Sequence, residues 1–181
     1  MKIEEIKKEY IRDAVRILVL SCEKELNAIF KDLELAKDLL FKYFELYPNG
    51  FVALDDRVAG FANVSCEERP MRKFLQKELG FFNGLKAWLL LSFFWMKPKK
   101  NDAILDFIVV SPLKRRKGIG TKLLEEILDR FSGKRIKCMI DVENNAAINL
   151  FSKFEFKKKF LENKMAEKYF GRKGWFLMVK E

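Results

Sequence analysis

The stretch that decides the fold is residues 105–124, LDFIVVSPLKRRKGIGTKLL, in which a strand pattern gives way to a basic turn and then to a helix pattern. Residues 105–110 alternate with period 2 and are rich in β-branched and aromatic side chains, and Pro112 cannot continue such a strand. From Gly118 apolar residues recur at helical spacing, so the amides of residues 116–120 become free donors of a helix N-terminus. Such a terminus attracts phosphate, and the stretch therefore predicts an anion site.

The order of residues in this turn excludes the two commonest nucleotide loops. A dinucleotide fingerprint requires a third glycine where this chain has Leu123. A P-loop requires Gly-Lys-Ser/Thr, whereas residues 120–122 read Gly-Thr-Lys. What remains is Arg-x-x-Gly-x-Gly at 115–120, preceded by Val-Ser-Pro at 110–112. This pattern resembles the acyl-CoA pyrophosphate loop of the GNAT superfamily of N-acetyltransferases, which reads Gln/Arg-x-x-Gly-x-Gly/Ala after a strand ending in Val-x-Pro.

The resemblance implies a donor site for acetyl-CoA as cosubstrate, with no metal. In the family, the amides of this loop hold the CoA pyrophosphate, the glycines let the backbone approach it, and the preceding strand splays to admit the pantetheine arm. The basic residues 114–117 would add electrostatic attraction for the CoA phosphates. The residues implied in donor binding here are Ile108, Val109, Val110, Arg115, Arg116, Lys117, Gly118, Ile119, Gly120 and Thr121.

A second match lies downstream, at 143–156, which reads ENNAAINLFSKFEF. It resembles the family's Asn-x-x-Ala-x-x-Leu-Tyr-x-x-x-Gly-Phe, with Asn144 capping a helix beside the donor. Two positions depart from that pattern: the family's tyrosine is Phe151 and its glycine is Glu155. Phe151 keeps the ring packing but has no hydroxyl, so it cannot protonate the leaving CoA thiolate.

The remainder of the chain fits a single domain over residues 1–181. The fold class expected is α/β (α+β): a mixed, mostly antiparallel central sheet, splayed at its middle and flanked by helices, with an extra aromatic helical insertion before the fourth strand. The further elements expected are a strand at 2–6, helices at 9–30 and 33–46, a hairpin of 51–54 with 58–64, a strand at 136–142 and a last strand at 174–179.

The segment 71–100 carries a concentrated aromatic cluster, from Phe81 to Met96, whose apolar residues surround a helix instead of lining one face. It is too short to span a bilayer. Three interpretations stay open: a helix buried under the sheet or against the first two helices, a homodimer interface or acceptor-lining lid, and docking of 81–100 on a membrane surface, which the lysines at 97–100 would favour.

The net charge of +10, from 36 basic and 26 acidic residues, raises the question of nucleic-acid binding. No nucleic-acid motif accompanies the basic residues, and one of their three clusters, 114–117, is already accounted for by CoA. The other two, 97–100 and 157–159, are expected to be solvated surface. No specific nucleic-acid partner is therefore expected.

The absence of histidine removes Ser-His and Cys-His nucleophiles and most catalytic zinc sites. Three widely separated cysteines in apolar patterns suit reduced thiols, and residues 1–10 lack the apolar core of a signal peptide, so a cytoplasmic protein is expected. Cys138 lies in a strand next to the expected cleft. A covalent acyl-cysteine there is an alternative to a buried structural thiol.

The expected reaction is direct transfer of acetyl from the CoA thioester to an amine, which must first lose a proton. Asp106 is the first candidate base, because it is expected on the same face of its strand as Ile108 and Val110 and an unpartnered Asp is costly in an apolar strand. Glu143, after the strand at 136–142, is the second candidate, with capping of the next helix as its alternative role. Tyr169 is a candidate acid for the thiolate.

The amides of Val109 and Val110 would polarise the thioester carbonyl. The acceptor is a protein or peptide amine or a small-molecule amine, and the chain carries no code that selects among them. The alternative function is a non-catalytic acyl-CoA-binding sensor or interaction module, for which Phe151 is the best support.

Overall fold

The computed structural model describes residues 1–162 and 164–181. Its first half contains β1 (Lys2–Glu5), α1 (Lys8–Ser21), α2 (Glu23–Phe30), α3 (Leu33–Leu46), β2 (Phe51–Asp55), β3 (Arg57–Ser65), α4 (Met71–Leu79) and α5 (Phe81–Leu91). Its second half contains β4 (Asp102–Val110), a 3-10 turn (Pro112–Lys114), α6 (Ile119–Arg130), β5 (Arg135–Asp141), α7 (Asn145–Lys153), β6 (Lys157–Glu162), α8 (Lys164–Phe170) and β7 (Gly174–Lys180).

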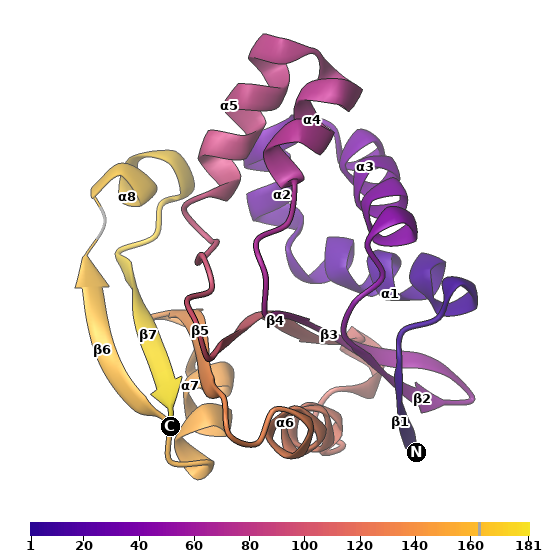
Figure 1. Cartoon of the computed structure of the whole chain (residues 1–181), viewed down its shortest axis with the longest axis vertical. Helices are drawn as coiled ribbons and strands as arrows, with labels where there is room; N and C mark the ends of the chain where they lie inside the picture. Colours follow the sequence, from indigo (N-terminus) through magenta and orange to yellow (C-terminus); the bar gives the residue numbers. More distant parts are fainter. Residues whose placement is uncertain (163) are drawn as a thin grey trace.

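The strands form one mixed sheet in the order β1-β2-β3-β4-β5-β7-β6. All neighbouring pairs are antiparallel except β4 and β5, which run parallel. Helices α1 to α5 lie on one side of the sheet and α6 and α7 on the other, so two separate apolar layers sandwich it (Figure 1). The fold expected from the sequence, a mostly antiparallel sheet flanked by helices, is confirmed.

The two apolar layers meet opposite faces of the central strands. Ile11, Val15 and Phe61 are fully enclosed in the layer under α1 to α5, and Leu123 and Ile127 of α6 are enclosed on the other face. Such close burial fixes the position of α6 on the sheet, and with it the turn that precedes this helix.

The sheet opens in its middle because β4 and β5 pair over only a short length. Their ladder joins Asp102, Ala103 and Ile104 to residues 135–137, and beyond Ile104 the two strands have no mutual register. Along its other edge, β5 pairs with β7 over residues 136–141. The side of β4 that faces β5 is therefore unpaired over 105–110, as the sequence predicted for a splayed strand.

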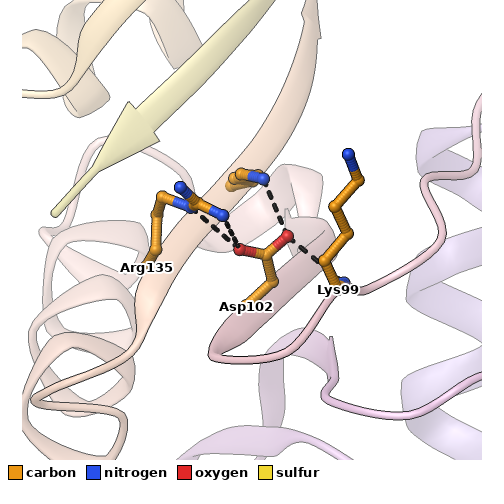
Figure 2. A network of polar contacts seen from close by, with 4 residues as sticks. Lys99, Asp102 and Arg135 are labelled. Atoms are coloured by element: carbon orange, nitrogen blue, oxygen red, sulfur yellow. Dashed lines mark hydrogen bonds and ion pairs between the residues drawn. The ribbon is translucent and has the colours of Figure 1, made fainter.

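A buried ion network holds the closed end of this opening. Asp102 is 1% exposed, and its carboxylate accepts hydrogen bonds from Arg135 Nε at 2.9 Å and Lys137 Nζ at 2.7 Å. The amide of Lys99 is 3.3 Å from Asp102 Oδ2 (Figure 2). Burial by itself opposes ionisation of Asp102, but the hydrogen bonds from Lys137 and Arg135 outweigh it and hold its pKa below the usual value.

Two helix predictions were wrong in their extent. The helix expected over 9–30 is two helices, because the chain turns at Cys22 (φ −118°, ψ 26°) between α1 and α2. The aromatic helix expected from Phe81 to Met96 ends at Leu91, and it forms a hairpin with α4 that turns at Gly80 with φ 79°. No helix among the described residues is both long and apolar enough to cross a bilayer.

Candidate active site

Strand β4 carries a bulge at its centre, and this bulge decides where Asp106 points. Asn63 of β3 pairs with Phe107 while its neighbour Val64 pairs with Leu105, so Asp106 has no partner in the ladder. Phe107 then belongs to the layer under α1 to α5, whereas Leu105 and Ile108 both belong to the α6 layer. An extra residue in one strand reverses the alternation beyond it in this way.

The expectation that Asp106 shares a face with Ile108 and Val110 was therefore wrong. Its carboxylate Oδ2 accepts hydrogen bonds from Asn63 Nδ2 and Ser65 Oγ, each at 2.6 Å. Ile108 and Val110 face α6 instead. The bulge separates the carboxyl group from the face of the sheet that meets the start of α6.

The carboxyl group of Asp106 loses its proton less readily than an ordinary aspartic acid. Desolvation raises its pKa to about 6, although the hydrogen bonds from Ser65 and Asn63 and the charge of Arg69 act in the opposite direction. Oδ1 has no exposed surface and no hydrogen-bond partner among the described residues. A carboxylate with a free lone pair and a pKa near 6 can take up a proton at neutral pH.

Asn63 and Ser65 were not singled out from the sequence, although a signal existed. Both are polar residues at alternate positions of an otherwise apolar strand, and they are 5% and 1% exposed. Tyr43 of α3 faces the same region: its hydroxyl is buried without a partner among the described residues, and the charges of Arg69 and Asp106 both act on it. Desolvation raises the pKa of Tyr43 to about 12, so its hydroxyl stays protonated.

The turn between β4 and α6 adopts the backbone shape that an anion loop needs. Arg116 and Gly118 both have positive φ, 60° and 75°, and α6 begins directly after Gly118 with no side-chain cap. The first turn of a helix has no intrahelical acceptors for its amides, so those of Ile119, Gly120 and Thr121 are available to a ligand. A Cβ placed on Gly118 would meet no described atom within 4 Å, so the loop is open on that side of Gly118.

Two of the four basic residues at 114–117 contact other parts of the protein, and the other two are exposed. Lys114 binds Asp55 of the β2–β3 hairpin, with 2.8 Å between Nζ and Oδ2, and so anchors the loop to the sheet. Arg115 donates from Nε to the carbonyl of Val110 at 3.4 Å. Arg116 and Lys117 are exposed. Of the basic run, these last two side chains therefore remain open to a phosphate.

The second predicted motif lies beside the first. Asn144 caps α7, its Oδ1 accepting from the amide of Ala147 at 3.1 Å, as expected. Phe151 is 1% exposed, and its ring packs edge-on against Phe156 at 4.9 Å. Leu150 lies 3.4 Å from where a Cβ on Gly120 would be, so α7 and the start of α6 are neighbours.

The remaining predicted residues lie in less enclosed places. Glu143 is in the turn after β5, with a half-exposed side chain 3.9 Å from Lys173 Nζ, and the cap of α7 is Asn144 and not Glu143. Tyr169 is 50% exposed on α8, and its ring stacks on Phe93 with centroids 6.4 Å apart. Neither contact joins these residues to Asp106.

The cysteine alternative is not favoured by the environment of Cys138. Its side chain is buried, and desolvation raises the pKa of the thiol far above its usual value, so the nucleophilic thiolate is suppressed. Within residues 1–162 and 164–181, no group of three or more Cys, Asp or Glu side chains is arranged to hold a metal ion.

Solved structures of similar shape span the whole chain. An N-acetyltransferase from Staphylococcus aureus superposes with a TM-score of 0.75 at 16% identity, covering 99% of this chain and 100% of that one. A ribosomal-protein-alanine N-acetyltransferase from Brucella melitensis gives 0.65 at 19% identity, with 100% and 99% covered. A putative acetyltransferase from Salmonella typhimurium, solved with its cofactor acetyl-CoA, gives 0.63 at 15% identity, with 100% and 93% covered.

Among curated proteins, none matches this chain. The model of the acetyltransferase (GNAT) family does match, over residues 13–156, a range that includes the bulged strand, the open loop and the capped α7. Because this range is most of the molecule and the fold agrees over its full length, the chain belongs to the GNAT family of acetyltransferases.

Proposed function

We propose that this protein is an acetyl-CoA-dependent N-acetyltransferase that moves the acetyl group directly from the CoA thioester to an amine. The observation that carries the proposal is the combination, at one end of β4, of an unpaired strand edge and an uncapped helix start behind a loop with two positive-φ residues. The unpaired strand edge suits the extended pantetheine arm of CoA, which carries amides. The uncapped helix start suits the CoA pyrophosphate.

The residues present fit such a donor. The amides of Ile119, Gly120 and Thr121 would hold the pyrophosphate, with Arg116 and Lys117 supplying charge. The free edge of β4 at 108–110 would pair with the arm, and the amides of Val109 and Val110 would polarise the thioester carbonyl. Phe151 would support this wall through packing, because its ring is enclosed.

In the proposed mechanism, Asp106 is the base. The amine nitrogen bonds to the acetyl carbon, the carbon–sulfur bond breaks with its electron pair going to sulfur, and the proton lost by the amine passes to Asp106. The free Oδ1 and the raised pKa support this role. Because Asp106 and Phe107 face α1 to α5, the acceptor would approach from that side, opposite α6.

The acceptor side has an aromatic wall that supports the lid interpretation of the segment after α5. Phe94 packs against Phe170 at 4.7 Å and against Trp175 at 5.7 Å, so this segment reaches across to α8 and β7. Tyr169 lies in the same wall through its contact with Phe93 and stays a candidate for protonating the thiolate. Glu143 stays the second candidate base.

The test is release of CoA from acetyl-CoA in the presence of a panel of amines: peptides with a free N-terminal alanine, lysine peptides, polyamines and small-molecule amines. Binding of acetyl-CoA is measured in parallel by calorimetry. Release that depends on one class of amine supports the enzyme and names the acceptor. Tight binding without release on any amine would favour the non-catalytic acyl-CoA sensor, for which the enclosed carboxyl of Asp106 and the missing hydroxyl at Phe151 are the specific observations.

A further inference from the structure

The hairpin of α4 and α5 exposes large apolar side chains that the donor and acceptor sites do not use. It lies at the edge of the molecule farthest from the sheet (Figure 1). At its turn, Phe81 is 61% exposed and Phe82 is 83% exposed, and Leu89 further along α5 is 50% exposed. The rings of Phe81 and Phe82 lie edge to face with centroids 5.4 Å apart, so they form one apolar protrusion at the tip of the hairpin.

This exposure does not result from a loosely packed helix. Helix α5 rests on α4 through small residues: a Cβ on Gly84 would lie 2.4 Å from Gln76 Cα, and Ala87 is 4% exposed. The inner face of α5 thus joins the core with α1 to α3. This agrees with the alternative in which the helix is buried against the first helices of the chain. Phe82 and Leu89 are seven residues apart, so they share the opposite face, which the described residues leave half or more exposed.

The charges around the tip are almost all positive. The hairpin carries four basic residues, Arg72, Lys73, Lys77 and Lys86, and all four are exposed. Its single acid, Glu78, is neutralised by Lys42 of α3, with Nζ 2.8 Å from Oε2. Lys86 lies between Phe82 and Leu89 on the same helix face, at i+4 from Phe82. Among the described residues none of these four cations has an ion pair, although Arg72 lies over the Trp88 ring. The apolar tip is therefore bordered by exposed positive charge.

We propose that this hairpin docks on an anionic lipid surface, with Phe81, Phe82 and Leu89 entering the interface and the lysines meeting the headgroup phosphates. Phenyl rings and leucine are suited to the boundary between headgroups and acyl chains, and lysines beside them add attraction to anionic lipid. No described helix spans a bilayer, so the contact is peripheral.

The two competing occupants fit the patch less well. A second copy meeting it across a two-fold axis would bring the same lysines together, and like charges oppose that contact. A nucleic acid would use the cations, but Phe81 and Phe82 lie edge to face and so form no common platform on which successive bases could stack. Leu89 has neither a ring nor a polar group with which to contact a nucleic-acid base, whereas it adds apolar area for contact with lipid.

The experiment is co-sedimentation of the full chain with phosphatidylcholine vesicles prepared with and without phosphatidylglycerol. Binding is expected only with the anionic lipid and is expected to weaken as salt rises. Phe81→Ser with Phe82→Ser should weaken binding at least about tenfold, because the apolar contact is lost. Lys73→Glu, Lys77→Glu and Lys86→Glu together should weaken it at least about a hundredfold, since each lysine near the surface contributes about fivefold.

Matched control variants distinguish binding by this surface from nonspecific binding of exposed apolar or basic residues elsewhere. Leu46→Ser, at the end of α3, removes an equally exposed apolar side chain, 62% exposed, elsewhere. Lys157→Glu, Lys158→Glu and Lys159→Glu in β6 change the net charge by the same amount at another exposed site. Both controls should retain binding, and circular dichroism melts should show all variants folded. Leu89→Ser alone is a second, milder test should the double Phe variant not fold.

Four results would overturn the proposal. They are no sedimentation of the wild type with anionic vesicles, equal losses in the hairpin and β6 charge variants, a dimer in light scattering that the Phe variants abolish, and salt-dependent RNA binding that depends on the hairpin lysines. None of these readouts uses acetyl transfer, so the docking surface and the proposed enzymatic function can fail independently.

Discussion

Asp106 holds a carboxyl group in a place that an apolar residue would occupy at lower cost. Two hydrogen bonds of 2.6 Å, from Asn63 and Ser65, satisfy one oxygen, and the other oxygen is enclosed without a partner among the described residues. Burial of a carboxylate with incomplete hydrogen bonding is unfavourable, which is why its pKa is raised to about 6. Retention of such a group is easiest to understand if it handles a proton.

We expect Asp106→Asn to lower kcat at least about a hundredfold while leaving the Kd for acetyl-CoA nearly unchanged, because a positioned base contributes that much and Asn keeps the shape. Steady-state kinetics and calorimetry check the two halves. The raised pKa means that ionisation of Asp106 opposes folding as pH rises through about 6. Asp106→Asn should therefore be at least as stable as the wild type at pH 8. If kcat is unchanged in this variant, Asp106 is not the base.

The pH dependence of kcat/KM should show an acidic limb near pH 6, because the base must be ionised. Ser65→Ala removes a hydrogen bond that favours the ionised form, so the pKa should rise and the limb should move to higher pH. Ser21→Ala is the matched control, since the Ser21 hydroxyl is also buried but belongs to α1. A limb that stays in place in Ser65→Ala would contradict the assignment.

At the scale of elements, the loop between β4 and α6 depends on backbone conformation more than on side chains. Gly118 has φ 75°, and a β-branched residue is strained there. Gly118→Val should weaken acetyl-CoA binding at least about tenfold, because the loop must change shape or leave the anion site.

Gly133→Val is the control for this prediction. Gly133 has φ 86° in the turn between α6 and β5, and like Gly118 it has open space where its Cβ would be. The two variants should lose similar stability in thermal melts, but only Gly118→Val should lose affinity in calorimetry. Equal affinity in both would count against the loop as the donor site.

The ion network of Asp102 is an element-scale feature that joins the paired ends of β4 and β5. Asp102→Asn should lower the free energy of unfolding by about 3 kcal/mol, because Arg135 and Lys137 lose a buried partner. Chemical denaturation measures it, with Glu126→Gln of the exposed Glu126–Arg130 pair as a control that should cost no more than about 0.5 kcal/mol.

The pH dependence of this stabilisation has a definite sign. The pKa of Asp102 is lowered in the folded protein, so its contribution is present above the ordinary carboxylate pKa and is lost as pH falls through the lowered value. The difference between wild type and Asp102→Asn should shrink on acidification. A constant difference down to strongly acidic pH would show that packing, and not charge, accounts for the effect.

At the scale of the whole molecule, Arg172 joins the helical layer to the half of the sheet formed by β5 and β7. Arg172, before β7, binds Glu25 of α2 and lies 2.7 Å from Asp141 Oδ2 at the end of β5. Burial alone would lower the pKa of Arg172, but these carboxylates outweigh it and hold the pKa above its usual value. The contact ties the helical layer of the proposed acceptor side to the far half of the sheet.

Arg172→Ala should destabilise the fold by about 2 kcal/mol and raise KM for the amine more than it lowers kcat, since the acceptor wall loses its tie to the sheet. The neighbouring Lys173→Ala, whose side chain is 75% exposed, serves as control and should change neither quantity much. Thermal melts and steady-state kinetics test both. A loss of kcat with KM unchanged would instead place Arg172 near the reacting atoms.

Most of the order of elements, and the strand–turn–helix around the proposed donor loop, could be predicted from the sequence because both depend on local rules. Period-2 alternation, a proline stop and a helix start at Gly118 are properties of neighbouring residues, and the structure has them at 102–110, 112–114 and 119–130. The break at Cys22 was missed, because apolar spacing continues through it. In the fold, α1 packs on β3 and β4, whereas α2 contacts α5 and α8, and these neighbours are distant in the sequence.

What the sequence by itself determined is the family, the sheet with its splayed strand, and the strand–turn–helix that forms the proposed anion loop. Only the tertiary structure decided the face on which Asp106 lies, its partners Asn63 and Ser65, and the network around Asp102. A bulge is set by the register against the neighbouring strand, and these partners are more than thirty residues apart in the chain. Their distances, and the pKa values that follow from them, arise only when the strands pair.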